Sequence, residues 1–323
     1  MKQESPTALF TVVRSTVGSQ RTCPIGLAPG EFYKVRLLYL PKLSYRTVRT
    51  AVKMKTYLAA AIQMTSLPDL EKNLIEAEEL IELAVRQGAE LVGLPENFSF
   101  LGKEEEKIAQ AQTIAHKSEK FLKTMAQRFQ VTILGGGFPV AVNSSKVYNT
   151  ALLVDPNGTE LARYQKVHLF DVNVPDGNTY RESTTVMPGT QLPPVYNSEQ
   201  LGTLGLSVCY DVRFPELYRH LAYKGADILF VPAAFTAYTG KDHWQVLLQA
   251  RAIENTCYVL APAQTGHHYA MRQSHGHAMI VDPWGVILAD AGDKPGVAIA
   301  EINPVRLEQV RRQMPSLQHR IFV

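Results

Sequence analysis

Three polar residues come directly after apolar runs of the chain, and their types are those that acyl transfer requires. Glu96 closes L-V-G-L-P-E, Lys166 lies within R-Y-Q-K-V-H-L-F, and Cys209 follows L-G-L-S-V. A thiol at a strand-to-helix junction points away from its sheet, where the next backbone N–H and the helix N-terminus can stabilise a thiolate and a developing oxyanion. A carboxylate can take the thiol proton and return it to a leaving amine, and an ammonium can polarise the substrate carbonyl. The trio therefore predicts acyl transfer through a thioester.

Each of these residues also has a structural explanation. A cysteine that follows a strand is more often a buried residue than a nucleophile, and a glutamate or lysine at a strand end is usually a solvated edge group. The other two cysteines show the contrast: Cys257 lies inside the apolar run T-C-Y-V-L-A-P and is expected in the core, and nothing around Cys23 argues for a function. Three scattered cysteines predict no disulfide framework and indicate a reducing, cytoplasmic compartment.

The elements that would position these groups begin at Tyr57, from where short apolar runs alternate with amphipathic helices. This alternation is typical of layered α/β architecture. The helix after the first strand is expected to be capped near Ser66, with Pro68 in its first turn, and to end at Gly88. The predicted strands are 57–64, 90–94, 131–134 with three glycines at its end, 204–208, 227–231 and 257–261, and the other predicted helices are 119–129, 214–224 and 242–255.

Two stretches, 149–162 and 277–289, share an apolar strand, a D-P-x-G turn and a second strand. Proline and glycine stand where a tight turn favours them. The match predicts two related hairpins, one in each of two packed sheets. The alternative is a common turn that occurs twice.

Charge and hydropathy exclude several classes of protein. No apolar run approaches the roughly 18 residues that a membrane-spanning helix needs, so no membrane association is expected. The chain has 33 Lys and Arg against 30 Asp and Glu, but nine of the basic residues and only two of the acidic ones fall in 1–53. The remainder is therefore mildly acidic, and no nucleic-acid partner is expected.

Residues 1–53 form a basic segment without an amphipathic period or the apolar core of a secretory signal. Three interpretations are open: a disordered tail, a cleaved organelle-targeting segment, or upstream sequence translated from a misplaced start codon. Because a strand is predicted within three residues of Met54, we favour the third and expect 54–323 to form the catalytic domain. A chain that begins at Met54 should then be fully active.

The motifs G-L-P-E-N-F, Y-Q-K-V-H-L-F-D and V-C-Y-D-V-R-F-P-E, in that order, resemble the Glu, Lys and Cys motifs of the nitrilase superfamily of carbon–nitrogen hydrolases. The resemblance spans about 55–320. It implies an α-β-β-α sandwich that pairs across subunits as a homodimer or homotetramer, with no cofactor. It also implies Cys209 as nucleophile, Glu96 as general base and Lys166 as oxyanion stabiliser. Glu182, in Y-R-E-S-T-T-V-M-P-G, matches the family's second glutamate, which would orient Lys166 or the substrate.

The residues after the nucleophile distinguish branches of this family. True nitrilases typically read Cys-Trp-Glu, whereas Cys209-Tyr210-Asp211 resembles the amidase branches, so hydrolysis of a small-molecule amide is expected. The stretches A-A-F-T-A-Y-T-G-K-D-H-W-Q-V-L-L-Q-A-R-A-I-E-N and H-G-H-A-M-I-V-D-P-W-G resemble the deaminated-glutathione amidases and, next, the ω-amidases. The first resemblance implies release of 2-oxoglutarate and cysteinylglycine from deaminated glutathione, and the second implies release of ammonia from 2-oxoglutaramate.

Either acyl group ends in an α-keto carboxylate, so the pocket needs a cation. Arg213, four residues beyond Cys209, is the candidate because a guanidinium binds a carboxylate through two hydrogen bonds. The alternative is that Arg213 pairs with a neighbouring acidic residue, Asp211 or Glu216, as part of the scaffold. The other expected substrate-binding residues are Tyr210, Phe235 and Thr239, although Phe235 fits the core equally well.

Four histidines, His267, His268, His275 and His277, lie within eleven residues and invite a zinc site. They lack a matching carboxylate spacing and an H-E-x-x-H motif, so no metal is predicted. His277 alternates with apolar residues and is expected in the core or the pocket. A scaffold or signalling protein that kept the fold without catalysis is the non-enzymatic alternative, and the retained catalytic set argues against it.

Overall fold

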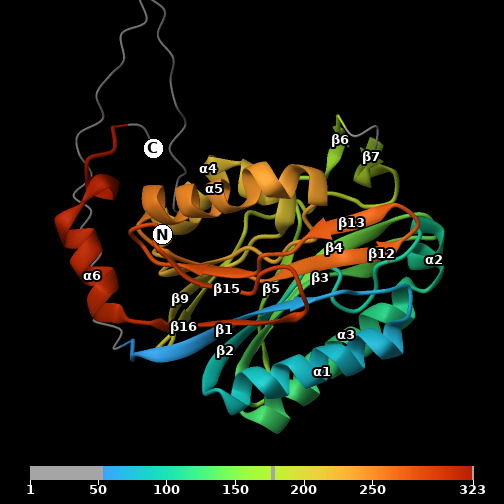
Figure 1. The fold of residues 1–323 in the computed structure, drawn as a ribbon, viewed down its shortest axis with the longest axis horizontal. Coiled ribbons are helices and arrows are strands. Elements are labelled where there is room, and N and C mark those ends of the chain that lie inside the picture. The colour runs from blue at the N-terminus through green and yellow to red at the C-terminus, as the bar shows by residue number, and fades with distance from the viewer. Residues whose placement is uncertain (1–53, 176–178, 322–323) are drawn as a thin grey trace, which may run out of the picture. The chain divides into compact units, whose positions relative to one another are not determined.

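The computed structural model describes residues 54–175 and 179–321, which lie within one compact unit spanning 51–323. The predicted N-terminal extension, 1–53, lies outside the described residues. Two large β-sheets face each other in the described part of the chain, and helices cover the outer face of each (Figure 1).

The larger sheet is built around β1 (Tyr57–Met64), which has the bounds predicted for the first strand. Its order is β13 (Arg272–His275), β12 (Ala263–Tyr269), β1, β2 (Ala89–Leu94), β3 (Thr132–Ala141), β4 (Val147–Val154) and β5 (Glu160–Gln165), and β16 (Gly296–Ile302) also pairs with β1. The strands β1, β2 and β3 are parallel to one another, so their carboxyl ends meet at one edge of the sheet.

Both faces of β1 are buried, because alternate residues of a strand point to opposite faces. Ala59 and Ala61 belong to the core between the two sheets. Ala60, Ile62 and Met64 belong to a second core beneath the outer helices. This double burial explains why the run is apolar throughout, and it confirms the predicted four-layer α-β-β-α sandwich.

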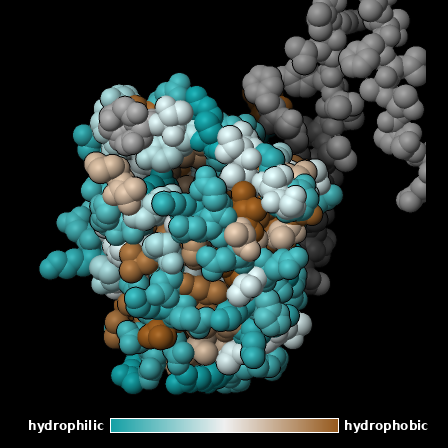
Figure 2. All heavy atoms as spheres, turned by 90° about the vertical axis from the view of Figure 1, so that its right-hand side faces the viewer, coloured by the Kyte–Doolittle hydropathy of each residue, from teal (hydrophilic) through white to brown (hydrophobic). Residues whose placement is uncertain are grey.

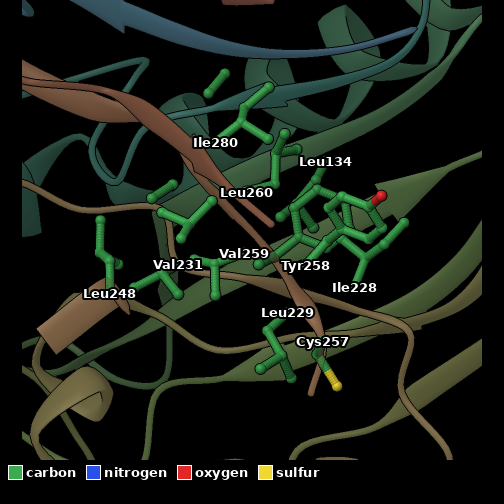
Figure 3. Close-up of a cluster of buried hydrophobic side chains, with 14 of the residues drawn as sticks. Leu134, Ile228, Leu229, Val231, Leu248, Cys257, Tyr258, Val259, Leu260 and Ile280 are labelled. Atoms are coloured by element: carbon green, nitrogen blue, oxygen red, sulfur yellow. The ribbon is translucent and has the colours of Figure 1, made fainter. Parts of the chain in front are cut away.

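The smaller sheet has the order β15 (Ile287–Asp290), β14 (Met279–Val281), β11 (Tyr258–Ala261), β10 (Ile228–Phe230), β9 (Gly202–Gly205) and β8 (Val195–Ser198). Its apolar side chains, such as Leu229, Val259 and Leu260, belong to one buried cluster that extends over both faces of this sheet (Figure 3). Cys257 belongs to the same cluster and is 0% exposed, which confirms its prediction as a core residue.

Two helices pack on the larger sheet, α1 (Leu70–Arg86) and α3 (Ala111–Phe129). On the smaller sheet lies α5 (Ala237–Asn255), with α4 (Pro215–Tyr223) beside it (Figure 1). The remaining elements are α2 (Glu104–Ala109), α6 (Pro304–Gln313), the two-stranded ribbon of β6 (Asp171–Asn173) and β7 (Thr179–Arg181), and the 3-10 turns η1 (Glu182–Thr184), η2 (Cys209–Arg213) and η3 (Ser316–Gln318). Among the described helices, none is long and apolar enough to cross a membrane.

The two D-P-x-G stretches form the hairpins β4–β5 and β14–β15. The first belongs to the larger sheet and the second to the smaller, as predicted. The predicted cap of α1 is wrong: the capping residue is Asp69, whose carboxylate accepts from the N–H of Lys72 at 3.2 Å. Ser66 is buried instead and donates to the carbonyl of Phe98 at 3.0 Å.

The prediction that the third strand ends at the glycines is also wrong, because β3 continues through Gly135, Gly136 and Gly137 to Ala141. These glycines make room for close neighbours. A Cβ atom on Gly135 would lie 2.4 Å from the side chain of Leu122, and one on Gly137 would lie 1.9 Å from Asn149 Oδ1. Glycine here thus permits close packing within a strand rather than ending it.

Candidate active site

A pocket of about 450 Å³ opens beside the carboxyl end of β2 and contains all four residues proposed for catalysis, Glu96, Lys166, Glu182 and Cys209. Its outer part is lined by α2, by β7 and by the turn between β12 and β13. These elements lie at the side of the molecule that Figure 2 faces, where hydrophobic side chains are interspersed among hydrophilic ones. The lining is correspondingly mixed, which suits a small polar substrate.

Lys166 lies between two carboxylates. Its Nζ is 3.1 Å from Glu96 Oε1 and 2.8 Å from Glu182 Oε2. Lys166 directly follows β5, Glu96 follows β2 by two residues, and Glu182 opens η1. Lys166 and Glu96 are almost completely buried, so a cation and an anion are held together away from water.

The backbone fixes both carboxylates. The N–H of Ala234 donates to Glu96 Oε2 at 2.9 Å, and the N–H of Phe170 donates to Glu182 Oε2 at 2.7 Å. Such charge-assisted bonds restrict the side-chain rotamers and satisfy the buried oxygens. Glu96 and Glu182 are therefore positioned before any substrate binds.

Asn149 connects the two carboxylates, and it was not predicted from the sequence as a site residue. Its Nδ2 lies 2.9 Å from Glu96 Oε1 and 3.4 Å from Glu182 Oε1, and its backbone carbonyl accepts from the N–H of Lys166 at 2.9 Å. Asn149 stands in the middle of β4, where the sequence shows only a strand residue. The three consecutive glycines of β3 could have indicated a side chain close to that strand, because Gly137 leaves the space that the Asn149 side chain occupies.

Cys209 occupies a sharp turn between β9 and α4. Its φ of 48° lies in the left-handed region, which is unusual for a residue with a side chain, and it opens η2. Its own N–H donates to the carbonyl of Pro232 at 2.9 Å. The carboxylate of Asp211 closes the turn by accepting from the N–H of Val208 at 2.9 Å. The turn directs the thiol into the pocket beside Glu96.

Burial and charge set the protonation of this cluster. Burial raises the pKa of the Cys209 thiol well above its usual value, the negative charge of Glu96 raises it further, and Lys166 opposes both. For Glu96, burial is the largest effect and would raise the pKa, but Lys166 together with hydrogen bonds from Cys209 and Ala234 outweighs it, and the pKa falls below its usual value. Cys209 is therefore a thiol that donates to a Glu96 carboxylate.

Lys166 stays an ammonium for the same reason. Burial is the largest effect and would lower its pKa, but the negative charges of Glu182 and Glu96 outweigh it and raise the pKa well above the usual value. The cluster thus holds a nucleophile with its proton, an acceptor for that proton, and a fixed positive charge.

The predicted substrate-binding residues fall into two groups. Tyr210, Phe235 and Thr239 line the pocket. Arg213 is not among the lining residues: its guanidinium carbon lies 5.1 Å from the ring of Phe235, and its Nη1 is 3.3 Å from His243 Nδ1. The described residues offer Arg213 no carboxylate within 4 Å, so the alternative of a scaffold ion pair with Asp211 or Glu216 is wrong.

The sequence interpretation also missed Arg272 and Tyr180 in the pocket lining. Arg272 belongs to the stretch M-R-Q-S-H-G-H on β13, and Tyr180 belongs to β7. They reach the pocket from two hairpins that are far apart in the chain, and no local sequence pattern predicts that these two residues lie side by side.

The histidines do not form a metal centre. Across residues 54–175 and 179–321, no three His, Cys, Asp or Glu side chains are grouped so as to hold a metal ion. The prediction for His277 is wrong: it lies between β13 and β14 with a φ of 57°, and its Nδ1 is 3.0 Å from Asp290 Oδ2. It is half-buried rather than in the core, because Asp290 and Asp293 hold it near the surface.

Comparison with known proteins agrees with this geometry. The carbon-nitrogen hydrolase family model matches residues 58–312. A deaminated glutathione amidase of Synechocystis is 77% identical over 272 residues, covering 84% of this chain and all of that protein. The deaminated glutathione amidase of Homo sapiens is 42% identical over 269 residues, covering 81% of this chain and 82% of that protein.

Solved structures resemble the fold as well. The Caenorhabditis elegans NitFhit protein has a TM-score of 0.78 and 39% identity, covering 83% of this chain and 66% of that chain. Saccharomyces cerevisiae Nit3, a member of branch 10 of the nitrilase superfamily, has a TM-score of 0.75 and 30% identity, covering 84% of this chain and 98% of that chain.

Proposed function

Because the chain belongs to the carbon-nitrogen hydrolase family, we propose that its substrate is deaminated glutathione, which it hydrolyses to 2-oxoglutarate and cysteinylglycine with Cys209 as nucleophile. The enzyme is an amidase, a hydrolase of carbon–nitrogen bonds in amides. The observation that carries the substrate is the 77% identity over the full length of the Synechocystis amidase. The cluster of thiol, carboxylate and ammonium in one pocket supports the mechanism.

Acylation begins with the hydrogen bond between Cys209 and Glu96. Glu96 takes the proton from Sγ as the sulfur forms a bond to the amide carbonyl carbon, and the carbonyl electron pair moves onto oxygen. The Lys166 ammonium stabilises this oxyanion. When the intermediate collapses, the C–N bond breaks and the proton on Glu96 passes to the leaving nitrogen. The products of this half-reaction are free cysteinylglycine and a thioester at Cys209.

Deacylation repeats these roles with water. Glu96 takes a proton from a water molecule, whose oxygen bonds to the thioester carbonyl carbon. Lys166 again stabilises the oxyanion. Collapse breaks the C–S bond, and Glu96 returns its proton to the departing sulfur. The released acid is 2-oxoglutarate, and the cluster is back in its starting protonation state.

Glu182 acts through Lys166 rather than on the substrate. Both of its oxygens lie within 3.0 Å of Nζ, and the N–H of Phe170 holds one of them. It thereby keeps the ammonium charged and aimed at the oxyanion, so Glu182 is a positioning residue. Tyr210, Phe235 and Thr239 contact the acyl chain in this proposal. Arg213, whose guanidinium lies against the rings of Tyr210 and Phe235, attracts its α-keto carboxylate through its charge.

The test is a comparison of kcat/KM on deaminated glutathione and on 2-oxoglutaramate with the purified full chain. The larger value is expected on deaminated glutathione. A larger value on 2-oxoglutaramate would reassign the enzyme to ω-amidase activity, and no turnover of either would contradict the proposal. Cys209→Ala should abolish turnover while the chain still unfolds cooperatively. Glu96→Gln should form no acyl-enzyme, as intact-protein mass spectrometry can establish.

Assembly as a homodimer or homotetramer remains a prediction from the family resemblance, and a cytoplasmic location remains a prediction from the cysteine content. Light scattering coupled to size-exclusion chromatography measures the first directly. Because the catalytic set lies within one chain, turnover per subunit should not require a residue from a partner.

A further inference from the structure

The pocket contains a guanidinium that the catalytic mechanism does not use. Arg272, the first residue of β13, lines the pocket together with Tyr180, and its guanidinium carbon lies 4.9 Å from the centre of the Tyr180 ring. Its Nη2 donates to the carbonyl of Ala234 at 3.0 Å. A guanidinium has five N–H donors, and this is the one hydrogen bond that the Arg272 side chain makes among the described residues.

The other cations of the pocket are already engaged. Lys166 is held by Glu96 and Glu182, and Lys107 is paired with Glu104 at 2.5 Å. Arg181 is exposed and donates to the backbone carbonyls of its own ribbon, including that of Tyr180 at 2.7 Å. Arg272 differs because it is half-buried and makes no ion pair within 4 Å among the described residues, although its charge contributes to the lowered pKa of Glu104. A partly desolvated guanidinium without a direct ion pair is suited to bind an anion of the substrate.

The backbone of Ala234 connects the Arg272 guanidinium to Glu96, the proposed general base. Its N–H donates to Glu96 Oε2 at 2.9 Å and its carbonyl accepts from Arg272 Nη2 at 3.0 Å. In the proposed mechanism Glu96 delivers a proton to the leaving nitrogen, so the leaving group lies on the Glu96 side of the thiol. Arg272 is therefore joined to that carboxylate through one residue and two hydrogen bonds, on the side of the pocket where the leaving dipeptide would lie.

We propose that Arg272 binds the terminal carboxylate of the leaving dipeptide and thereby determines the preference for a dipeptide amide over a primary amide. This inference rests on the proposed function, since deaminated glutathione carries one carboxylate on its acyl part and a second on its glycine. The acyl carboxylate is common to 2-oxoglutaramate, whereas the glycine carboxylate is not. The Tyr180 ring stacks on the guanidinium and orients it for a bidentate hydrogen-bonded contact with that carboxylate.

The experiment compares three substrates with the wild-type chain and with Arg272→Ala: deaminated glutathione, the same molecule with a glycine carboxamide, and 2-oxoglutaramate. In the wild type, the carboxamide should lower kcat/KM roughly ten- to 100-fold, the loss expected for a hydrogen-bonded ionic contact. Arg272→Ala should lower kcat/KM on deaminated glutathione by a similar factor, mainly through KM. In the variant, the carboxylate and carboxamide substrates should differ by less than about threefold.

The controls separate this role from a structural one. Arg181→Ala removes the other guanidinium of the outer pocket, and it should leave the preference for carboxylate over carboxamide at the wild-type ratio. Arg272→Lys retains a charge and should recover part of that ratio. Equal losses on all three substrates in Arg272→Ala would overturn the inference and indicate that Arg272 positions Ala234 and Glu96 instead. Failure of the wild type to hydrolyse deaminated glutathione would contradict the proposed function itself, which is a different outcome.

Discussion

The side-chain amide of Asn149 donates a hydrogen bond of 2.9 Å to Oε1 of Glu96, the same oxygen that faces Lys166. Burial alone would raise the pKa of Glu96, but the Lys166 ammonium and the hydrogen bonds from Cys209 and Ala234 lower it, and the Asn149 amide donates one more hydrogen bond to the charged carboxylate. The proposed base is thus kept ionised chiefly by the Lys166 ammonium, and β4 contributes a further donor through Asn149, although burial alone would favour the neutral acid.

We expect Asn149→Ala to lower kcat/KM roughly ten- to 100-fold, because one hydrogen bond to a buried charge is removed. The loss of this donor should also raise the pKa of Glu96, so the acidic limb of the pH profile of kcat/KM should move to higher pH. Thr150→Val is the matched control, since Thr150 is the next residue of β4 and its buried hydroxyl has no hydrogen-bond partner among the described residues. An unshifted acidic limb in Asn149→Ala would show that the amide only fills space.

Lys166→Met should be destabilising as well as inactive. It leaves the Glu96 carboxylate buried without its cation, and breaking a buried pair in this way costs about 3–5 kcal/mol of unfolding free energy. In the wild type, the lowered pKa of Glu96 contributes stability above the usual glutamate pKa, and this contribution is lost as the pH falls. In the variant, burial should raise that pKa, so the deficit should be large at pH 7.5 and smaller near pH 5.

Urea denaturation at both pH values measures this difference. Lys72→Met serves as the control, because its pair with Asp69 is exposed to solvent and should contribute little to stability. A deficit that does not depend on pH would mean that the cost of Lys166→Met comes from packing rather than from an uncompensated carboxylate.

Hydrophobic periodicity and the residue types of the turns were enough to predict much of the fold. The apolar run at 57–64 became β1 with the predicted bounds, and the two D-P-x-G hairpins fell into different sheets. Errors arose where distant contacts override the local pattern. The glycines of β3 signal a break locally, yet Leu122 and the Asn149 side chain approach them from other elements.

The candidate site shows the same contrast between residues that a local pattern predicts and residues that distant contacts bring in. Glu96, Lys166 and Cys209 were proposed because each was expected to follow an apolar strand, and the structure places all three in one pocket. Asn149 and Arg272 lie within strands and reach the pocket through their side chains, so their types carry no local signal. The alternation of His277 with apolar residues also led to a wrong prediction, because the backbone at His277 is left-handed and not extended as in a strand.

His268 should make the fold sensitive to mild acid. Its ring is buried, with Nδ1 donating to the carbonyl of Ser66 at 2.8 Å and Nε2 lying 2.9 Å from the hydroxyl of Ser274. Burial lowers the pKa of His268 to about 4. In the unfolded chain the ring takes a proton near pH 6.5, so the stability that His268 contributes is complete above that pH and is lost as the pH falls toward 4.

The His268→Gln variant cannot titrate at this position, so its melting temperature should fall less steeply than that of the wild type between pH 7 and 5. Differential scanning calorimetry across this range provides the comparison. His267→Gln, at an exposed neighbouring ring, should retain the wild-type slope. Identical slopes in all three proteins would assign the acid sensitivity to other groups.

Iodoacetamide should modify Cys209 far faster than Cys257. Cys209 lines the pocket and its proton has an acceptor in Glu96, whereas Cys257 is fully buried with its Sγ 3.0 Å from the carbonyl of Ala226. Because burial raises the pKa of Cys209, its labelling rate should keep increasing as the pH is raised from 7 to 9. Peptide mapping after short exposure should find the label at Cys209 in proportion to lost activity, and 2-oxoglutarate, as the expected product, should slow the reaction. Labelling of Cys257 at a comparable rate in the folded chain would contradict both its burial and the special environment of Cys209.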